Sequence, residues 1–175
     1  MITFESLMNI DKDSLSEAAR NLGSDDIAIL VEWLALKDDN IRYQALQLLQ
    51  HRSALCDDVY PYWDTLRDKL KSDNSYQRSI GILLIAENAR WDSEDRIEVV
   101  LDDLLELLND EKPITIRQCI QSLGKIASAK PALNAKIAEK LASFDIMAIK
   151  ETMRKSILLD ILNVLLLIRK SLRTD

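Results

Sequence analysis

Apolar residues recur every three or four positions along most of this chain, the spacing that places them on one face of an α-helix. Within residues 41–54 the apolar side chains share one arc of a helical wheel and polar side chains share the opposite arc, and residues 113–129 show the same division. Residues 79–86 are apolar nearly all round, which is typical of a helix at the centre of a core. The pattern predicts an all-α fold.

Turn residues divide this pattern into nine expected helices. Their expected bounds are about 13–22, 24–37, 39–54, 57–72, 74–89, 92–109, 113–129, 131–143 and 147–172. We expect Gly23 to end the first helix and Ser24 to cap the second. Each of the three prolines lies near an expected helix start, where its missing N–H would have no intrahelical partner.

One turn recurs along the chain. Residues 36–40 (LKDDN) resemble residues 70–74 (LKSDN), which lie 34 positions later, and residues 108–110 (LND) follow after another 38. An arginine follows each turn early in the next helix, and a fourth follows a weaker turn: Arg42, Arg78, Arg117 and Arg154. A period of this size is typical of an α-solenoid, in which each helix pair buries its apolar face against its neighbours.

An aspartate in the turn followed by an arginine makes the array resemble HEAT repeats, or the related armadillo-like repeats, over about residues 24–173. The resemblance implies a short right-handed α–α superhelix of about four helix pairs. The expected organisation is a single domain, residues 1–175, with an N-terminal cap at 1–23 and repeats at about 24–54, 57–90, 92–130 and 131–173. The fourth repeat departs from the pattern, because only Asp145 or Glu151 precedes Arg154.

The resemblance also implies a structural ladder between successive repeats. Its expected members are Asp38, Arg42, Asp73, Arg78, Asp110, Arg117 and Arg154. A partly buried arginine needs a carboxylate partner, and the turn aspartates are the nearest supply. The alternative is that these arginines contact a ligand directly.

Charge is distributed unevenly over a chain whose net charge is −6. Counted over residues 41–54, 76–90, 114–130 and 150–173, the second helices of the four pairs carry 13 basic and 3 acidic residues. In an array resembling HEAT repeats these helices line the concave side, which would then be relatively basic, whereas the convex side would be acidic. The other interpretation is that basic helix C-termini and acidic N-termini simply complement the helix dipole.

The sequence offers little for catalysis. His51 is the only histidine, the cysteines Cys56 and Cys119 lie far apart, and no glycine-rich phosphate loop is present. We therefore expect no enzyme activity, cofactor or metal. The N-terminus lacks the pattern of a signal peptide, and the apolar run 157–168 is interrupted and shorter than the roughly 20 residues of a membrane span. A cytoplasmic location and no membrane contact are expected.

A noncatalytic module for protein–protein interaction, acting as a scaffold or adaptor, is the function that these features favour. The exposed faces of helices 39–54 and 113–129 supply candidate partner-binding residues: Tyr43, Gln44, Gln47, His51, Gln118, Gln121 and Lys125. Nucleic-acid binding along the same groove is an alternative. It is not the expected one, because these faces hold few charges for phosphates. A third possibility is an accessory subunit of a modifying enzyme.

The last helix carries more apolar surface than one neighbour should bury. One arc suits the core, whereas a second arc contains Leu158, Leu162 and Leu166, which we include among the candidate partner-binding residues. Ser156, Asp160, Asn163 and Lys170 are expected to form a polar strip. Either the protein covers the second arc itself, or the arc is a seam for a partner or for a homodimer through this helix.

Overall fold

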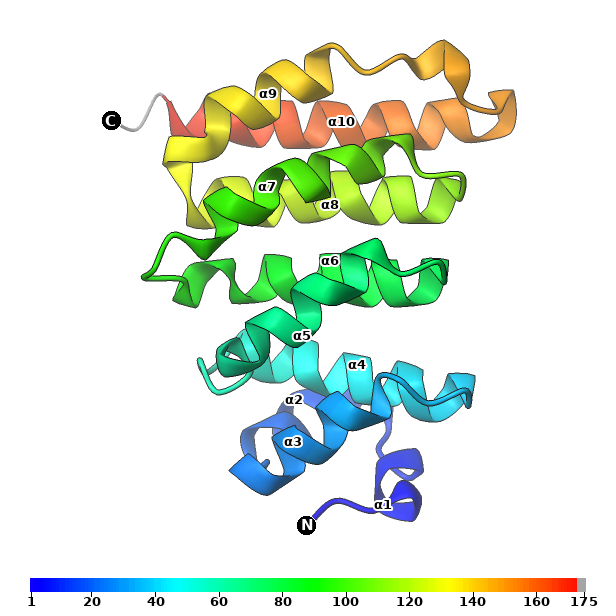
Figure 1. The fold of residues 1–175 in the computed structure, drawn as a ribbon, viewed down its shortest axis with the longest axis vertical. Coiled ribbons are helices and arrows are strands. Elements are labelled where there is room, and N and C mark those ends of the chain that lie inside the picture. The colour runs from blue at the N-terminus through cyan, green and yellow to red at the C-terminus, as the bar shows by residue number, and fades with distance from the viewer. Residues whose placement is uncertain (173–175) are drawn as a thin grey trace.

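The computed structural model describes residues 1–172, in which ten α-helices stack in sequence order from one end of the molecule to the other (Figure 1). The prediction of an all-α fold is confirmed. The helices are α1 Phe4–Met8, α2 Leu15–Arg20, α3 Ser24–Trp33, α4 Asp39–Ser53, α5 Trp63–Asp68, α6 Ser75–Asn88, α7 Arg96–Glu106, α8 Pro113–Ala129, α9 Asn134–Ala142 and α10 Glu151–Ser171. Short 3₁₀ turns lead into or extend several of them.

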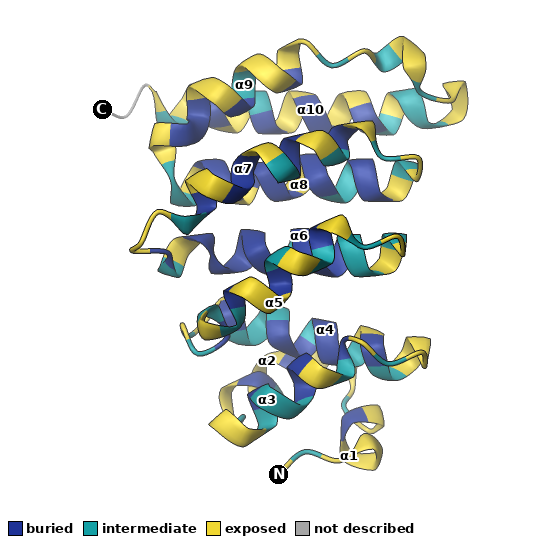
Figure 2. Cartoon of the chain, in the orientation of Figure 1, coloured by how far each residue is buried: buried dark blue, intermediate teal, exposed yellow. Residues whose placement is uncertain are grey.

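From α3 onwards the helices form two layers. In Figure 1, α3, α5, α7 and α9 lie in front of α4, α6, α8 and α10. Within the second layer α4 packs on α6, α6 on α8, and α8 on α10. Buried residues run as a column between the layers (Figure 2). Each helix pair therefore buries its apolar face mainly against the pairs next to it.

The middle of the array is α6, as its apolar sequence predicts. Ile82, Leu84 and Ile85 are fully buried. A Cβ atom added at Gly81 would lie 2.8 Å from the backbone oxygen of Leu66, so a glycine is needed where α6 crosses the end of α5. This close crossing explains a glycine inside a helix, a position that otherwise costs stability.

The N-terminal prediction was wrong in detail. Residues 13–22 were expected to form one helix, but the structure has a 3₁₀ turn at Lys12–Ser14 and then α2, and it adds α1. A helix of five residues is too short to show a period in the sequence. Tertiary contacts hold it instead, because Leu7 is buried and the Phe4 ring stacks on Trp33 with 4.4 Å between centroids.

First-layer helices are shorter than predicted. The segment expected at 57–72 is split into a 3₁₀ turn at Tyr60–Tyr62, α5, and a second 3₁₀ turn at Lys69–Lys71. The helix expected from residue 92 starts at Arg96, because the Asp92 carboxylate accepts hydrogen bonds from the Arg96 and Ile97 N–H groups. In the second layer, the helix expected from residue 147, α10, also starts later, at Glu151, after a separate 3₁₀ turn.

Ser24 was expected to be the N-cap of α3, but Gly23 takes that position. The Asp26 side chain explains the difference, since it accepts a hydrogen bond from the Gly23 N–H at 3.0 Å and a second from Ile2. The bond from Gly23 is the main reason why the pKa of Asp26 is lowered. Asp26 thereby fastens the start of the chain to α3.

Candidate interaction surfaces

An open groove of about 950 Å³ runs across α4, α6 and α8. Its lining includes exposed aromatic and aliphatic side chains, several amides, and few charges. The residues that line it are Asp39, Asn40, Arg42, Tyr43, Leu46, Gln47, Gln50, Ser75, Tyr76, Ser79, Ile80, Leu83, Lys112, Ile114, Gln118 and Gln121. We call this surface the second-layer groove.

Four of the predicted partner-binding residues line the second-layer groove: Tyr43, Gln47, Gln118 and Gln121. Tyr43 is 54% exposed. Gln118 places its side-chain oxygen in a buried position where it has no hydrogen-bond partner among the described residues.

The other candidates on α4 and α8 have different surroundings. The His51 Nδ1 atom lies 3.1 Å from the Ser16 Oγ, so its ring is turned toward α2. Gln44 is half-buried and is not part of the groove lining. Lys125 forms an ion pair with the buried Glu87 of α6. These positions do not form one surface with Tyr43.

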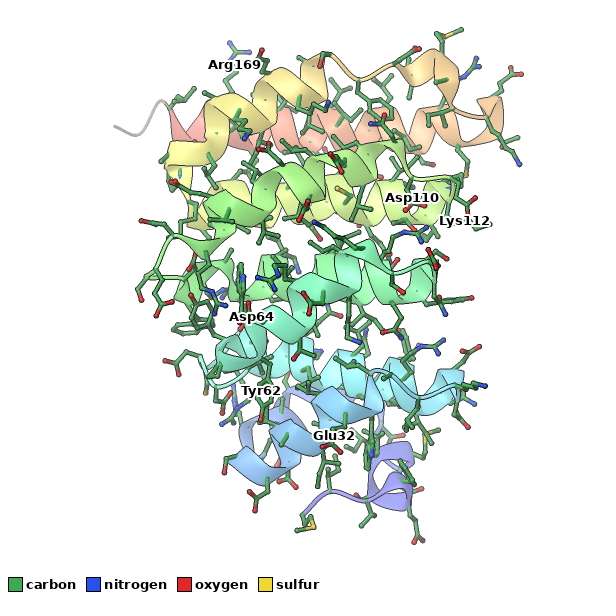
Figure 3. All side chains as sticks on the ribbon, viewed as in Figure 1. Glu32, Tyr62, Asp64, Asp110, Lys112 and Arg169 are labelled. Carbon is green, nitrogen blue, oxygen red and sulfur yellow. The ribbon has the colours of Figure 1, made fainter. Side chains whose placement is uncertain are left out.

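Arg78 links two successive turns. Its guanidinium donates to the Asp110 carboxylate at 2.6 and 3.0 Å and to the carbonyls of Ser72 and Asp73. The Asp110 side chain is only 3% exposed, and it also accepts the Lys112 N–H at 2.8 Å at the start of α8. Figure 3 shows Asp110 and Lys112 together at this turn. The Asp110 bond is the main cause that raises the Arg78 pKa.

Arg117 was expected to bind one of the turn aspartates, and that expectation was wrong. It instead donates to Asp160 in the middle of α10, at 2.6 and 3.3 Å. Asp160 was expected on a polar strip, but it is buried against α8, where Gln121 is a further donor. The reason is its position on the wheel of α10, beside the buried Ile161 and Val164.

The remaining arginines bind their own turns. Arg42 is buried, donates to the Leu36 carbonyl at 2.9 Å, and pairs with Asp39 three residues before it. Its guanidinium also lies 5.1 Å from the centre of the Tyr76 ring, a cation–π arrangement. Arg154 donates to the carbonyls of Ile149 and Met147, and not to the carboxylates that were expected.

Two of the expected ladder aspartates do not pair with an arginine through their carboxylates. The Asp38 side chain caps α4 by accepting hydrogen bonds from the Asn40 and Ile41 N–H groups. Asp73 contributes its backbone carbonyl to Arg78. Among the expected ladder residues, the carboxylate contact that crosses from one turn to the next is therefore Arg78 with Asp110.

A buried cluster around Asp92 was not predicted. The Asp92 carboxylate accepts the Tyr60 hydroxyl at 2.7 Å as well as two N–H groups at the start of α7, and Lys130 lies 3.9 Å away. Burial raises the pKa of Asp92, but these hydrogen bonds outweigh it and lower the pKa overall. Burial, together with Asp92, raises the pKa of Tyr60 to about 12. The signal in the sequence was an aspartate four residues before a helix start.

Cys119 offers no reactive site. Cys119 is fully buried and donates to the Leu104 carbonyl at 3.1 Å, and burial raises its pKa well above the ordinary value, which makes it inert. Across residues 1–172, no group of three or more His, Cys, Asp or Glu residues is arranged to hold a metal. Within the same part of the chain, no helix has both the length and the hydropathy needed to cross a membrane.

The second apolar arc of α10 lies open. Four leucines of this arc are about half exposed: Leu158 (46%), Leu159 (50%), Leu162 (45%) and Leu166 (52%). The other arc is buried, as predicted, with Ile157, Ile161, Val164 and Ile168 in the core. The interpretation in which the protein covers both arcs does not hold for the described residues. We call the exposed set the α10 leucine face.

Comparison with known proteins supports the fold alone. No protein-family model matches the chain, and no curated protein matches it significantly. Two crystal structures of engineered proteins resemble it. Target OR329 of the Northeast Structural Genomics Consortium has a TM-score of 0.53 and 18% identity over 92% of this chain and 80% of that one. Target OR497 has a TM-score of 0.51 and 17% identity over 92% of this chain, which spans 47% of that longer protein.

Proposed function

We propose that this chain is a noncatalytic, HEAT-like or armadillo-like module that binds a protein partner in the second-layer groove. The repeated turns and the bond between Arg78 and Asp110 of successive turns support the choice of repeat type. The observation that carries the function is the groove itself: about 950 Å³, open, and lined by aromatic, aliphatic and amide side chains.

The chemistry of the groove suits a segment of polypeptide. Tyr43, Tyr76 and Leu83 offer large apolar surfaces. Aromatic residues are enriched among the residues that contribute most of the binding free energy at protein interfaces. Amides such as Gln47 and Gln118 can donate to and accept from backbone groups of a bound chain. Because the helices are already ordered, little entropy is lost in forming the surface.

The groove is poorly suited to nucleic acid. Its two cations are Arg42 and Lys112, and Arg42 is already held by Asp39 and the Leu36 carbonyl. Binding of a phosphate backbone needs several cations to release counterions. We expect no salt-sensitive binding of duplex or single-stranded DNA or RNA at physiological salt, measured by fluorescence anisotropy. A submicromolar complex would favour the nucleic-acid alternative.

The test combines affinity capture with groove variants. The protein is immobilised, exposed to a lysate of its host, and the captured proteins are quantified by mass spectrometry and purified for titration. Tyr43→Ala with Tyr76→Ala should weaken binding of the partner on the order of 10-fold or more, because large aromatic side chains act as hot spots. Val99→Ala, a change at an exposed apolar residue of α7, is the control and should have no effect. A partner that binds both variants like the original protein would contradict the groove proposal.

A further inference from the structure

The α10 leucine face lies on the side of α10 that is turned away from α8. Asp160 and Val164 mark the side toward α8, since Asp160 binds Arg117 and Val164 lies against Gly124. At 100° per residue, Leu162 is roughly opposite these two residues. The leucines thus occupy the end of the array, beyond which the structure describes no further helix pair (Figure 1).

The adjacent helix continues this apolar surface. Lys136 of α9 pairs with Asp102 of α7 at 2.6 Å, which identifies the side of α9 that faces α7. The side away from α7 carries small residues at helical spacing: Ala135 and Ala142 are exposed, and Ala138 is half-buried against the core. A row of leucines beside a row of alanines is a surface on which one further helix can pack closely.

The leucine face is bounded by positive charge at both ends. Lys155 precedes the leucines and Arg169 follows them, on the same arc of the helix. Figure 3 shows Arg169 projecting away from the end of the array. Both side chains are exposed, and among residues 1–172 neither has a carboxylate within ion-pair distance. The two cations lie about 21 Å apart along the axis, and the leucines between them span about 12 Å.

These charges argue against a second copy as the occupant. A two-fold antiparallel pairing of two α10 helices, centred on Leu162, would place Lys155 of each copy opposite Arg169 of the other. Like charges in that arrangement repel. The same cations attract an amphipathic helix that has carboxylates at both ends of its apolar stripe.

We propose that the α10 leucine face docks an amphipathic helix of a partner protein, with Leu158, Leu162 and Leu166 against its apolar stripe and Lys155 and Arg169 paired with flanking carboxylates. Its carboxylates would lie about 14 residues apart, a spacing that matches the two cations along an α-helix. This surface is separate from the second-layer groove. Each proposal can therefore be tested without depending on the outcome of the other.

The probe is a synthetic peptide of about 20 residues, held helical by a lactam bridge, with a leucine stripe and a glutamate at each end. A matched peptide has lysine in place of both glutamates. Binding is measured by fluorescence anisotropy, with circular dichroism to establish that every variant is folded. We expect the glutamate peptide to bind more tightly, and its advantage to decrease as salt is raised.

Two changes to the protein test the two parts of the site. Leu162→Glu should weaken binding of the glutamate peptide on the order of 100-fold, because it places a carboxylate in the apolar contact. Reversal of both cations, Lys155→Glu with Arg169→Glu, should leave the fold intact and reverse the preference toward the lysine peptide, roughly 10-fold each way at low salt. Val99→Glu is the control and should bind like the original protein.

Several results would overturn the proposal. Equal binding of the two peptides, or an unchanged preference in the charge-reversed protein, would remove the carboxylate requirement. No binding of either peptide would show that the face does not dock a helix of this kind. A dimer seen by light scattering that Leu162→Glu converts to a folded monomer would make a second copy the occupant. If Leu162→Glu unfolds the protein, the charge-reversed protein still decides the question.

Discussion

At the scale of single residues, this fold depends on a few buried charged groups whose partners lie in other helices. Arg78 and Asp110 join two turns, Arg117 and Asp160 join α8 to α10, and Asp92 receives a tyrosine and two backbone N–H groups. Removing one partner leaves the other buried without compensation, which costs more than the pair contributes. In an exposed ion pair, loss of one partner costs little, because water solvates the charge that remains.

Arg78→Ala should lower the free energy of unfolding by about 1–3 kcal/mol, because the Asp110 carboxylate would remain buried without its main partner. Urea denaturation monitored by circular dichroism measures the change. Arg67→Ala is the matched control: its partners Asp64 and Asp68 are exposed, so its effect should stay within about 0.5 kcal/mol. Equal losses in the two variants would show that burial of the Arg78 pair adds nothing.

Asp92→Ala should destabilise the protein by about 1–2 kcal/mol at neutral pH, because α7 loses its cap. The pKa of Asp92 is lowered in the folded protein, so its contribution is complete above the ordinary carboxyl pKa of 3.8 and is lost as the pH falls through the folded value. The stability difference from the original protein should therefore shrink at acidic pH. Glu94→Ala, a change in the same loop that removes none of the hydrogen bonds of Asp92, is the control and should cost less stability at neutral pH. A difference that stays constant down to low pH would contradict this.

At the scale of helices, close approach distinguishes the two glycines of the second layer. A Cβ at Gly81 would meet a backbone oxygen at 2.8 Å, whereas one at Gly124 would meet a methyl group of Val164 at 3.2 Å. Backbone atoms cannot move aside without shifting α5, but a valine side chain can adjust. The same substitution should therefore have different consequences at the two positions.

Gly81→Ala should lower stability by about 1–3 kcal/mol through overpacking, although alanine is the better helix former. Gly124→Ala should be close to neutral, since the gain in helix propensity of roughly 1 kcal/mol offsets a mild contact. Thermal and urea unfolding of the two variants provide the comparison. If Gly81→Ala proved the more stable of the two variants, this result would contradict the close approach of α6 to the end of α5.

At the scale of the whole molecule, stability is built from contacts between neighbouring helices, so position along the array matters. Helix α6 packs on both α4 and α8, whereas α10 has α8 and α9 on one side and its leucine face open on the other. Helices at the ends of such an array open more readily than those in the middle.

Native-state hydrogen exchange followed by mass spectrometry should therefore show the slowest exchange in α6 and faster exchange in α1 and α10. Binding of the glutamate peptide to the leucine face should slow exchange in α10 and leave α4 unchanged. Uniform protection along residues 1–172 would instead indicate that the array unfolds as one unit.

Much of the second layer could be predicted from the sequence. Helix α8 begins and ends where the pattern placed it, and α4 differs by one residue at its end, because these helices are long and their apolar period is sustained. The first-layer helices were overestimated, since Pro61 and the Asp92 cap shorten them in ways that an apolar period does not reveal. Helix α1 left no periodic signal at all.

The sequence by itself determined the all-α class, the repeating turn and the two apolar arcs of α10, because these follow from local spacing and helical geometry. The tertiary structure decided which charges meet: Arg78 reaches the next turn, Arg117 reaches Asp160, and His51 turns toward Ser16. It also decided that Tyr43 and Gln118 share a groove while the leucines of α10 stay uncovered. Such contacts depend on how successive helix pairs are stacked, and residues more than 30 positions apart carry no local signal of that stacking.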